Sequence, residues 1–239
     1  MFISKFYNYC GLKNLKDREI WLKEAIKKIP KGESILDAGA GELQYKKYCT
    51  DLKYISQDFG QYSGDGKEGL QMGKWDNSKL DIVSDITHIP VENNSFDNIM
   101  CIEVFEHLPE PQLAIKEFSR ILKSDGRLII TAPFCSLTHF APYYYANGYS
   151  KYFYEKFLKE NDFSILEISY NGNYFEYLAQ ELHRIIKMSD KYSKVNVFVK
   201  FMIMCSIFPL LLLLNKLSKK NRGSEEVLCF GLHILAIKK

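Results

Sequence analysis

Short apolar runs alternate with segments of helical spacing along most of the 239-residue chain. Residues 15–29 carry apolar side chains at helical spacing and are followed by Pro30 and Gly32, which predicts a helix that ends there. The same spacing predicts a helix directly after Gly41, in which Leu43 and Leu52 share one face. Further helices are expected at 111–123, 150–160 and 174–188, and strands at 34–38, 54–58, 80–84, 95–103, 127–132, 163–170 and 226–237. The alternation of strands and helices is typical of an α/β fold.

The first predicted strand leads into a turn that contains two glycines. An apolar run that includes Asp37 is followed by Gly39 and Gly41. Glycine at these positions permits a left-handed backbone or the close approach of a ligand. A buried strand, a glycine turn and a following helix form the first half of a nucleotide-binding unit.

Acidic residues stand at the ends of the first four predicted strands. Asp58 lies 21 positions after Asp37, where a carboxylate binds ribose hydroxyls in nucleotide-binding folds, and its alternative interpretation is a solvated acid at a strand end. Asp85 and Glu103 follow the third and fourth strands. Ligands of open α/β sheets bind at the carboxyl ends of the strands, so we expect these four acids at one site. Such an acidic edge suits a cationic sulfonium ligand better than a phosphate-rich dinucleotide.

Composition and charge exclude several classes of protein. The net charge is only +3, from 32 basic and 29 acidic residues, so nucleic acid is not expected as a partner. The six cysteines include no Cys-x-x-Cys pair and have no histidine at metal-ligand spacing, so we expect reduced thiols and no metal site. Residues 1–15 show no secretory signal, and a cytoplasmic location is expected.

The sequence Asp37-Ala38-Gly39-Ala40-Gly41 resembles Asp-x-Gly-x-Gly, the first motif of class I S-adenosylmethionine-dependent methyltransferases. The resemblance implies that the glycine backbone packs against the methionine part of S-adenosylmethionine and that Asp37 orders its amino group. Gln44 stands where a dinucleotide fingerprint has its third glycine, which disfavours an NAD-dependent oxidoreductase.

The resemblance extends from residue 33 to residue 135 and to the final strand. It implies that Asp85 pairs with the adenine amino group and that the backbone of Ile86 contacts the ring. The segment Val104 to Pro109, after Glu103, resembles the fourth motif of the family. The implied fold is Rossmann-like, with a mostly parallel seven-stranded sheet, an antiparallel last strand and a helical, partly hydrophobic insertion before that strand. The cofactor-binding residues are therefore predicted to be Asp37, Gly39, Gly41, Asp58, Asp85, Ile86 and Glu103.

Two histidines are candidates for catalysis. His139 follows the fifth strand among aromatic residues, and Tyr143, Tyr144 and Tyr145 offer rings on which an acceptor would stack. His107 follows the fourth strand on the acceptor side of the methyl group. A positioned histidine assists the loss of a hydroxyl proton. The alternatives are that His107 caps the next helix and that His139 only anchors its loop.

The C-terminal third departs from the alternating pattern. We expect a single domain over 1–239, with 171–224 as its insertion. Residues 201–214 form an apolar run without charge that is short for a membrane span. Because the final strand must return to the sheet, a re-entrant or interfacial segment is favoured over a span. Residues 195–222 would then contact anionic lipid at the inner face of the cytoplasmic membrane, and the alternatives are an internal helical cap or a dimer interface.

Two functional hypotheses from different classes follow. The first is methyl transfer from S-adenosylmethionine to a small-molecule, glycan or lipid-linked acceptor, at oxygen. The second is a non-catalytic, membrane-associated scaffold that binds the cofactor. Fold analogy does not identify the acceptor.

Overall fold

The computed structural model describes residues 10–239, which form two compact units. The sheet unit contains residues 20–169 and 231–239. The hairpin unit contains residues 170–230 together with the described part of the N-terminal segment up to residue 19. We describe each unit by itself.

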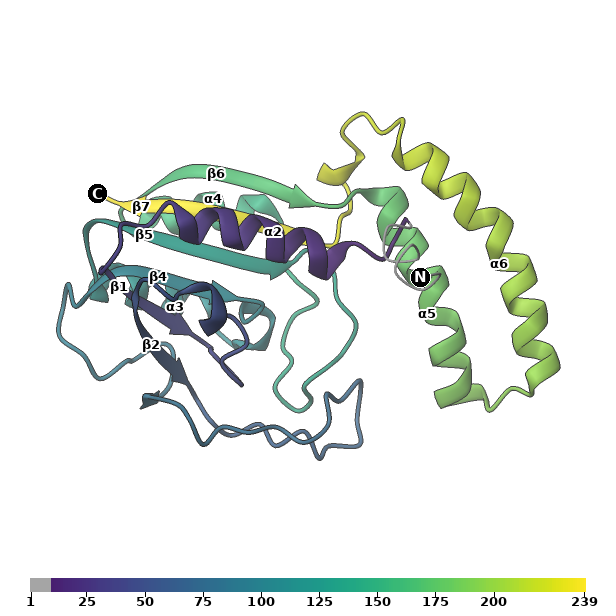
Figure 1. Cartoon of the computed structure of the whole chain (residues 1–239), viewed down its shortest axis with the longest axis horizontal. Helices are drawn as coiled ribbons and strands as arrows, with labels where there is room; N and C mark the ends of the chain where they lie inside the picture. The colour runs from purple at the N-terminus through teal and green to yellow at the C-terminus, as the bar shows by residue number, and fades with distance from the viewer. Residues whose placement is uncertain (1–9) are drawn as a thin grey trace. The chain divides into compact units, whose positions relative to one another are not determined.

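The sheet has seven strands in the order β3-β2-β1-β4-β5-β7-β6 (Figure 1). β1 pairs in parallel with both β2 and β4, so the strand order reverses beside β1, and this reversal is where ligands bind in open α/β sheets. β7 runs antiparallel to β5, with Ile234 opposite Ile130. The mostly parallel seven-stranded sheet with an antiparallel last strand, expected from the sequence, is confirmed. The strands are β1 Ser34–Ala38, β2 Lys53–Asp58, β3 Ile82–Val83, β4 Phe96–Ile102, β5 Leu122–Pro133, β6 Phe163–Asn171 and β7 Gly231–Lys238.

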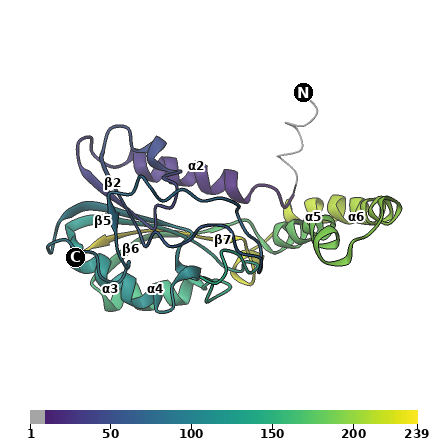
Figure 2. The ribbon, with the colours of Figure 1, turned by 90° about the horizontal axis from the view of Figure 1, so that it is seen from below.

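Helices cover both faces of the sheet. α3 (Pro111–Ile121) and α4 (Lys151–Glu160) lie on one face, and α2 (Asn14–Lys27) lies on the other (Figure 2). Leu22 and Ile26 of α2 belong to the same buried cluster as Ile35, Met100 and Ile129 of β1, β4 and β5. Strands that are covered in this way must be apolar on both sides, which explains the continuous apolar runs in the sequence.

The prediction of a helix directly after the glycine turn is wrong. The chain between β1 and β2 forms turns and one short 3-10 helix, η1, at Lys46–Tyr48. Leu43 adopts a left-handed backbone with φ of 61°, which an α-helix does not accommodate.

Two strand boundaries also differ from the prediction. β3 has two residues because only Ile82 and Val83 pair with β2. β5 begins at Leu122, directly after α3, so Asp125 and Gly126 lie inside the strand and do not end the helix. Asp125 has φ of 62°, and the pairing with β4 is irregular near Phe96.

The hairpin unit consists mainly of α5 (Tyr174–Ser193) and α6 (Val197–Ser218), which pack side by side (Figure 1). The Asn173 side chain accepts hydrogen bonds from the first turn of α5, and Asn196 does the same for α6. Lys194, with φ of 48°, makes the turn between them. A short 3-10 helix, η3 (Ser224–Glu226), occupies the start of the segment expected to be the last strand, so β7 begins at Gly231.

α6 is long and apolar enough to cross a membrane by length and composition. Only 6% of its most apolar 18-residue window is buried within the described residues. Its exposed apolar side chains include Phe198, Phe201, Met202, Met204, Phe208, Leu210, Leu212 and Leu213.

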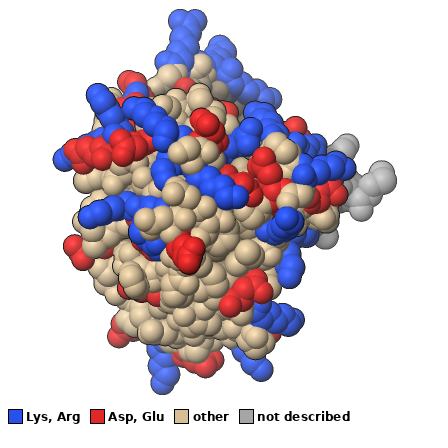
Figure 3. Space-filling view, turned by 90° about the vertical axis from the view of Figure 1, so that its left-hand side faces the viewer, with Lys and Arg blue, Asp and Glu red and all other residues tan. Residues whose placement is uncertain are grey.

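Charged side chains of both signs are intermixed on the face of the molecule in Figure 3. This distribution agrees with the small net charge of +3. The absence of a nucleic-acid partner stays a prediction.

Candidate functional site

The turn after β1 is shaped by two glycines with left-handed backbones. Gly39 has φ of 81°, and a Cβ built there would lie 2.4 Å from Cγ2 of Val104. Gly41 has φ of 51°, and its Cβ would lie 2.7 Å from Cζ2 of Trp75. A larger residue at either position would therefore meet both backbone strain and a steric clash. The turn thus carries no side chains at its two glycines, and Val104 and Trp75 pack against it at the carboxyl end of β1.

Asp58 ties the end of β2 to this turn. Its Oδ2 accepts a hydrogen bond of 3.0 Å from the amide of Gly41, and its Oδ1 accepts one of 2.9 Å from the amide of Gly60. A carboxylate has about four lone-pair positions, so these two bonds leave room for ribose hydroxyls. The predicted neighbourhood of Asp58 and the glycine turn is therefore present.

Asp37 lies beneath the turn and is only 1% exposed. Its Oδ2 accepts a hydrogen bond of 2.6 Å from the hydroxyl of Tyr54. Burial raises the pKa of the Asp37 carboxyl to about 7, with the nearby Asp58 charge acting in the same direction and the Tyr54 hydrogen bond opposing it. A buried carboxyl with a raised pKa is a common feature of functional sites.

Glu103 and Asp85 occupy the other strand ends. Glu103 has an unusual φ of 58°, and its Oε1 accepts a hydrogen bond of 2.9 Å from the Thr131 hydroxyl of β5. The next residue, Val104, covers Gly39. Asp85 is exposed after β3, and its Oδ1 accepts 2.8 Å hydrogen bonds from the amide and hydroxyl of Thr87. The neighbouring Ile86 is buried, with 6% exposure.

A second cluster forms where the chain leaves β4 and β5. The 3-10 helix η2 (Phe105–His107) presents Glu106 and His107, and the loop after β5 presents His139. Oε1 of Glu106 lies 3.6 Å from Nε2 of His107 and 3.7 Å from Nε2 of His139. Glu106 is 1% exposed, and the two imidazole centroids are 4.7 Å apart. The sequence predicted both histidines but missed Glu106, whose position directly before His107 is its only signal.

Backbone carbonyls orient both histidines. Nδ1 of His107 donates a 2.6 Å hydrogen bond to the carbonyl of Tyr143, and Nδ1 of His139 donates one of 2.8 Å to the carbonyl of Leu137. Burial lowers the pKa of His107 to about 4, and the adjacent His139 acts in the same direction. His107 is therefore neutral near pH 7. It does not cap α3, whose N-cap residue is Glu110.

The three predicted acceptor-binding tyrosines occupy different surroundings. The ring of Tyr144 lies 5.3 Å from that of His139, and its hydroxyl donates to the carbonyl of Ser136. The ring of Tyr143 meets Phe59 edge-on at 4.8 Å. The side chain of Tyr145 is 54% exposed. Only Tyr144 is brought into contact with the histidine cluster by the ring distances.

Two loops that flank the site are paired with each other. The amide of Leu70 donates to the carbonyl of Thr138 at 2.9 Å, and the amide of Phe140 donates to the carbonyl of Leu70 at 3.2 Å. Phe140 stacks on Tyr62 at 4.2 Å and meets Trp75 edge-on at 5.1 Å. The glycine-rich segment 59–79 contacts both the glycine turn and the loop of His139. Trp75 and Phe140 were not predicted as site residues.

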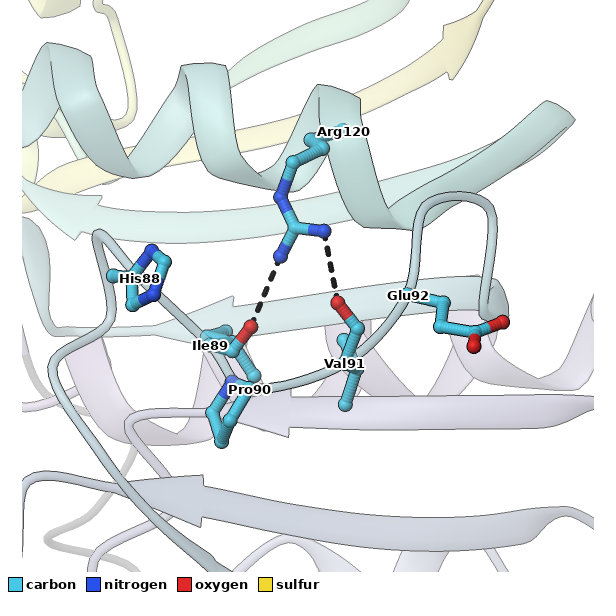
Figure 4. Close-up of a pocket in the computed structure, with 6 residues that line it drawn as sticks. All are labelled: His88, Ile89, Pro90, Val91, Glu92 and Arg120. Carbon is cyan, nitrogen blue, oxygen red and sulfur yellow. Dashed lines mark hydrogen bonds between the residues drawn. The ribbon is translucent and has the colours of Figure 1, made fainter.

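A hollow of about 480 Å³ lies away from these residues, between α3 and the segment 88–92 (Figure 4). Arg120 points from α3 toward that segment and donates hydrogen bonds to the carbonyls of Ile89 and Val91. It also pairs with Glu117 at 2.6 Å. Arg120 is therefore a structural clamp, and the expected site residues do not line this hollow.

The segment that contains the glycine turn and Asp58 matches a family of known proteins. Residues 36–130 match a family model described as a methyltransferase domain. An uncharacterized protein of Methanocaldococcus jannaschii is 43% identical over 49 residues, which are 20% of this chain and 21% of that protein. Methyltransferase GfsG of Streptomyces halstedii is 36% identical over 63 residues, 26% of this chain and 21% of that protein. The matches therefore span about a fifth of these two relatives.

Solved structures extend the similarity to almost the whole chain. Geranyl diphosphate C-methyltransferase from Streptomyces coelicolor, solved with Mg²⁺, geranyl diphosphate and S-adenosyl-L-homocysteine, superposes with a TM-score of 0.52. The sequence identity is 11%, and the superposition covers 94% of this chain and 79% of that one. At this identity the likeness concerns the fold alone.

Proposed function

Residues 36–130 form a class I methyltransferase domain, and from that premise we propose that the protein transfers a methyl group from S-adenosylmethionine to an oxygen atom of a small-molecule, glycan or lipid-linked acceptor. The observation that carries the proposal is the joint placement of the glycine turn and Asp58 at the strand-order reversal.

The residues at the turn fit this methyl donor. Gly39 and Gly41 place backbone without side chains at the end of β1. The Asp58 carboxylate has further lone pairs that can accept hydrogen bonds from ribose hydroxyls. The buried carboxyl of Asp37 and that of Glu103 supply negative charge for an ammonium or sulfonium group. When bound, S-adenosylmethionine supplies a methyl group already activated by a positively charged sulfur.

The main task of the chain in this reaction is alignment. Holding two reacting atoms in attack geometry lowers a barrier by roughly 7 to 11 kcal/mol. Asp58 fixes the turn, and Val104 packs on Gly39, so the position of one reactant is set by the strand ends. The loop after β5 carries Tyr144 and His139 and would position the second reactant, the methyl acceptor.

An oxygen acceptor must also lose a proton, and the second cluster offers basic atoms for this step. Because Nδ1 of His139 donates to a carbonyl, its Nε2 keeps a lone pair, and we rank this atom first as the acceptor of the hydroxyl proton. His107 is the second candidate. Tyr143, Tyr144 and Tyr145 are proposed to contact the acceptor.

Ligand-induced stabilisation tests the proposal. S-adenosylhomocysteine at 100 times its dissociation constant stabilises its binder by about 2.7 kcal/mol, which a thermal-shift measurement resolves. We expect S-adenosylhomocysteine, and not NAD, to raise the melting temperature of the wild type. Asp58→Ala should lose most of this shift, whereas the matched control Asp51→Ala, an exposed acid paired with Lys31, should keep it. No shift with S-adenosylhomocysteine would overturn the proposal.

We also propose that residues 195–222 attach the protein to the membrane surface. α6 exposes apolar side chains on several sides, and Lys216, Lys219, Lys220 and Arg222 follow its apolar part. Apolar burial and attraction to anionic headgroups act together in such segments. α5 continues from β6, and the chain after α6 returns to β7 of the same sheet, which favours a hairpin that enters and leaves by one side.

Flotation with vesicles that contain anionic lipid tests this attachment. Phe201→Ser combined with Phe208→Ser should abolish flotation, and Met72→Ser, at an exposed apolar residue of the sheet unit, should leave it intact. Equal flotation of all three proteins would contradict the proposal. Flotation of a protein that neither binds S-adenosylhomocysteine nor transfers methyl groups would favour the scaffold hypothesis.

A further inference from the structure

We propose that Glu106, His107 and His139 bind a divalent transition-metal ion, an inference that rests on the proposed methyl transfer and assigns a partner to the acceptor side of that site. One ligand atom from each residue lies within 4.8 Å of the other two. The three residues come from two segments, η2 and the loop after β5, which the fold brings together.

Each imidazole donates a hydrogen bond from Nδ1 to a backbone carbonyl. A backbone carbonyl only accepts, so Nδ1 of His107 and Nδ1 of His139 must each carry a proton. In the neutral rings each Nε2 therefore presents a lone pair. Metal-binding histidines typically make this same bond from their other ring nitrogen, which fixes the tautomer and the ring orientation.

The Nε2 atoms of the two histidines lie near the carboxylate of Glu106. Nε2 of His107 and Nε2 of His139 lie 3.6 and 3.7 Å from the same oxygen, Oε1 of Glu106. Three electron-rich atoms thus converge in a place where Glu106 is 1% exposed. A carboxylate oxygen and two imidazole lone pairs attract a positive charge, and the two candidates are a proton and a metal ion.

Distances and donor types favour a metal ion. Zinc bonds to nitrogen and oxygen of about 2.0 to 2.2 Å place neighbouring ligand atoms of a tetrahedral site about 3.3 to 3.6 Å apart. The two separations from Oε1 of Glu106, 3.6 and 3.7 Å, are close to this range. The remaining pair of ligand atoms lies within 4.8 Å, so the two imidazoles would have to move closer together on binding an ion. Two imidazoles and one carboxylate suit Zn²⁺, Fe²⁺, Co²⁺ or Mn²⁺ and leave open positions for a ligand from outside.

The surrounding chain holds the ligands in place. The carbonyl of Glu106 accepts hydrogen bonds from the amides of Tyr145 and Ala146, which ties η2 to the loop after β5. Tyr144 and Phe140 pack against both imidazoles. The cluster is thus built from oriented side chains and is not a chance gathering on an exposed surface.

The ion would change how the acceptor is activated. An acceptor hydroxyl that binds at an open position has its pKa lowered by the cation, so its proton passes to a water molecule and the alkoxide stays on the ion. The oxygen then attacks the methyl carbon as the carbon–sulfur bond breaks, and the electron pair of that bond remains on sulfur. With the ion bound, Nε2 of both histidines would hold the metal, and the ion together with water would replace His139 in the proton-accepting role proposed above.

Cobalt binding to the untagged full-length protein tests the inference. After chelator treatment, Co²⁺ is added alone and followed by calorimetry and visible absorption. We expect one Co²⁺ per chain, and a loss of affinity of about 100-fold or more in Glu106→Gln and His139→Asn. His88→Asn, which changes an exposed histidine outside the cluster, should bind as the wild type does.

The thermal shift with S-adenosylhomocysteine, measured on the same samples, shows that each variant is folded and separates the two proposals. A wild type that S-adenosylhomocysteine stabilises but that takes up no Co²⁺ overturns the metal site and leaves methyl transfer standing; the cluster then holds a shared proton. Co²⁺ affinity that is equal in His139→Asn and in the wild type overturns it as well. Stoichiometric Co²⁺ binding without any effect of S-adenosylhomocysteine supports the metal site and contradicts the proposed methyl transfer.

Discussion

The indole of Trp75 packs against Gly41, where a Cβ would lie only 2.7 Å from Cζ2 of the ring. Trp75 belongs to the segment 59–79 and also meets Phe140 of the loop after β5. A side chain from one loop therefore covers the turn at which the methyl donor is proposed to bind. We expect occupancy of the turn to change the surroundings of this indole.

Tryptophan fluorescence reports that change. The chain has two tryptophans, and the other, Trp21, stacks on His233 at 4.8 Å within the sheet unit. S-adenosylhomocysteine should alter the emission of the wild type and of Trp21→Phe. It should leave the emission of Trp75→Phe unchanged. A ligand-dependent signal that survives in Trp75→Phe would mean that the indole does not face the bound ligand.

Alanine substitutions at Gly39 and Gly32 distinguish the cost of backbone strain from the cost of steric overlap. Both have left-handed backbones, but a Cβ on Gly32 has no atom within 4 Å, whereas a Cβ on Gly39 meets Val104 at 2.4 Å. Gly32→Ala should lower the free energy of unfolding by about 1 to 2 kcal/mol, the cost of a left-handed residue. Gly39→Ala should cost about 1 to 3 kcal/mol more, because Val104 must move.

Urea unfolding measures both variants. Adding Val104→Ala to Gly39→Ala should recover part of the extra loss, since the double substitution removes the overlapping atoms. Equal losses in the two glycine variants would show that the chain around Val104 yields freely.

The buried carboxyl of Asp37 makes stability depend on pH. Its pKa is about 7 in the folded protein and about 4 in an unfolded chain, so between these values the folded state holds the additional proton. The free energy of unfolding therefore falls as the pH rises through this window, with a slope of up to about 1.4 kcal/mol per pH unit from this group. Asp37→Asn removes this contribution.

Urea unfolding at pH values from 5 to 8 compares the two proteins. The wild type should lose stability relative to Asp37→Asn as the pH rises. Tyr54→Phe, which removes a hydrogen bond that favours the ionised carboxyl, should raise the folded-state pKa of Asp37 and so extend the decline to higher pH. Parallel pH profiles of the wild type and Asp37→Asn would contradict the assignment.

His139→Ala tests the acceptor side of the site. We expect turnover to fall at least tenfold, because either a general base or a metal ligand is lost. The thermal shift with S-adenosylhomocysteine should stay as in the wild type, since His139 contacts the acceptor-side residues Glu106, His107 and Tyr144. The control His88→Ala should keep full turnover. Near-normal turnover of His139→Ala would remove this residue from the mechanism.

The sequence was sufficient to predict the sheet and the placement of Asp58 beside the glycine turn. Apolar runs that must be covered on both faces stand out, and Asp37, Gly39, Gly41 and Asp58 follow them at characteristic spacing. The helix after Gly41 failed because helical spacing does not reveal the left-handed backbone of Leu43. The apolar residues there have helical spacing, but the chain between Leu43 and β2 forms turns and a short 3-10 helix.

The second cluster was harder to predict because it depends on contacts between distant segments. His139 was a candidate by its place after β5, but its proximity to Glu106 requires the loop to fold back onto η2. The role of Trp75 depends in the same way on the pairing of Leu70 with Thr138. Glycine-rich loops carry no periodicity, so nothing in residues 59–79 indicated that partner.

The backbone pairing of Leu70 with Thr138 and Phe140 has a kinetic consequence. One loop covers the glycine turn through Trp75, and the other carries His139, so the two cannot open independently while they remain hydrogen-bonded. Exchange of the spent donor would then require the acceptor side to open as well. S-adenosylhomocysteine should therefore not exchange while the methylated product is still enclosed by the loop that carries His139.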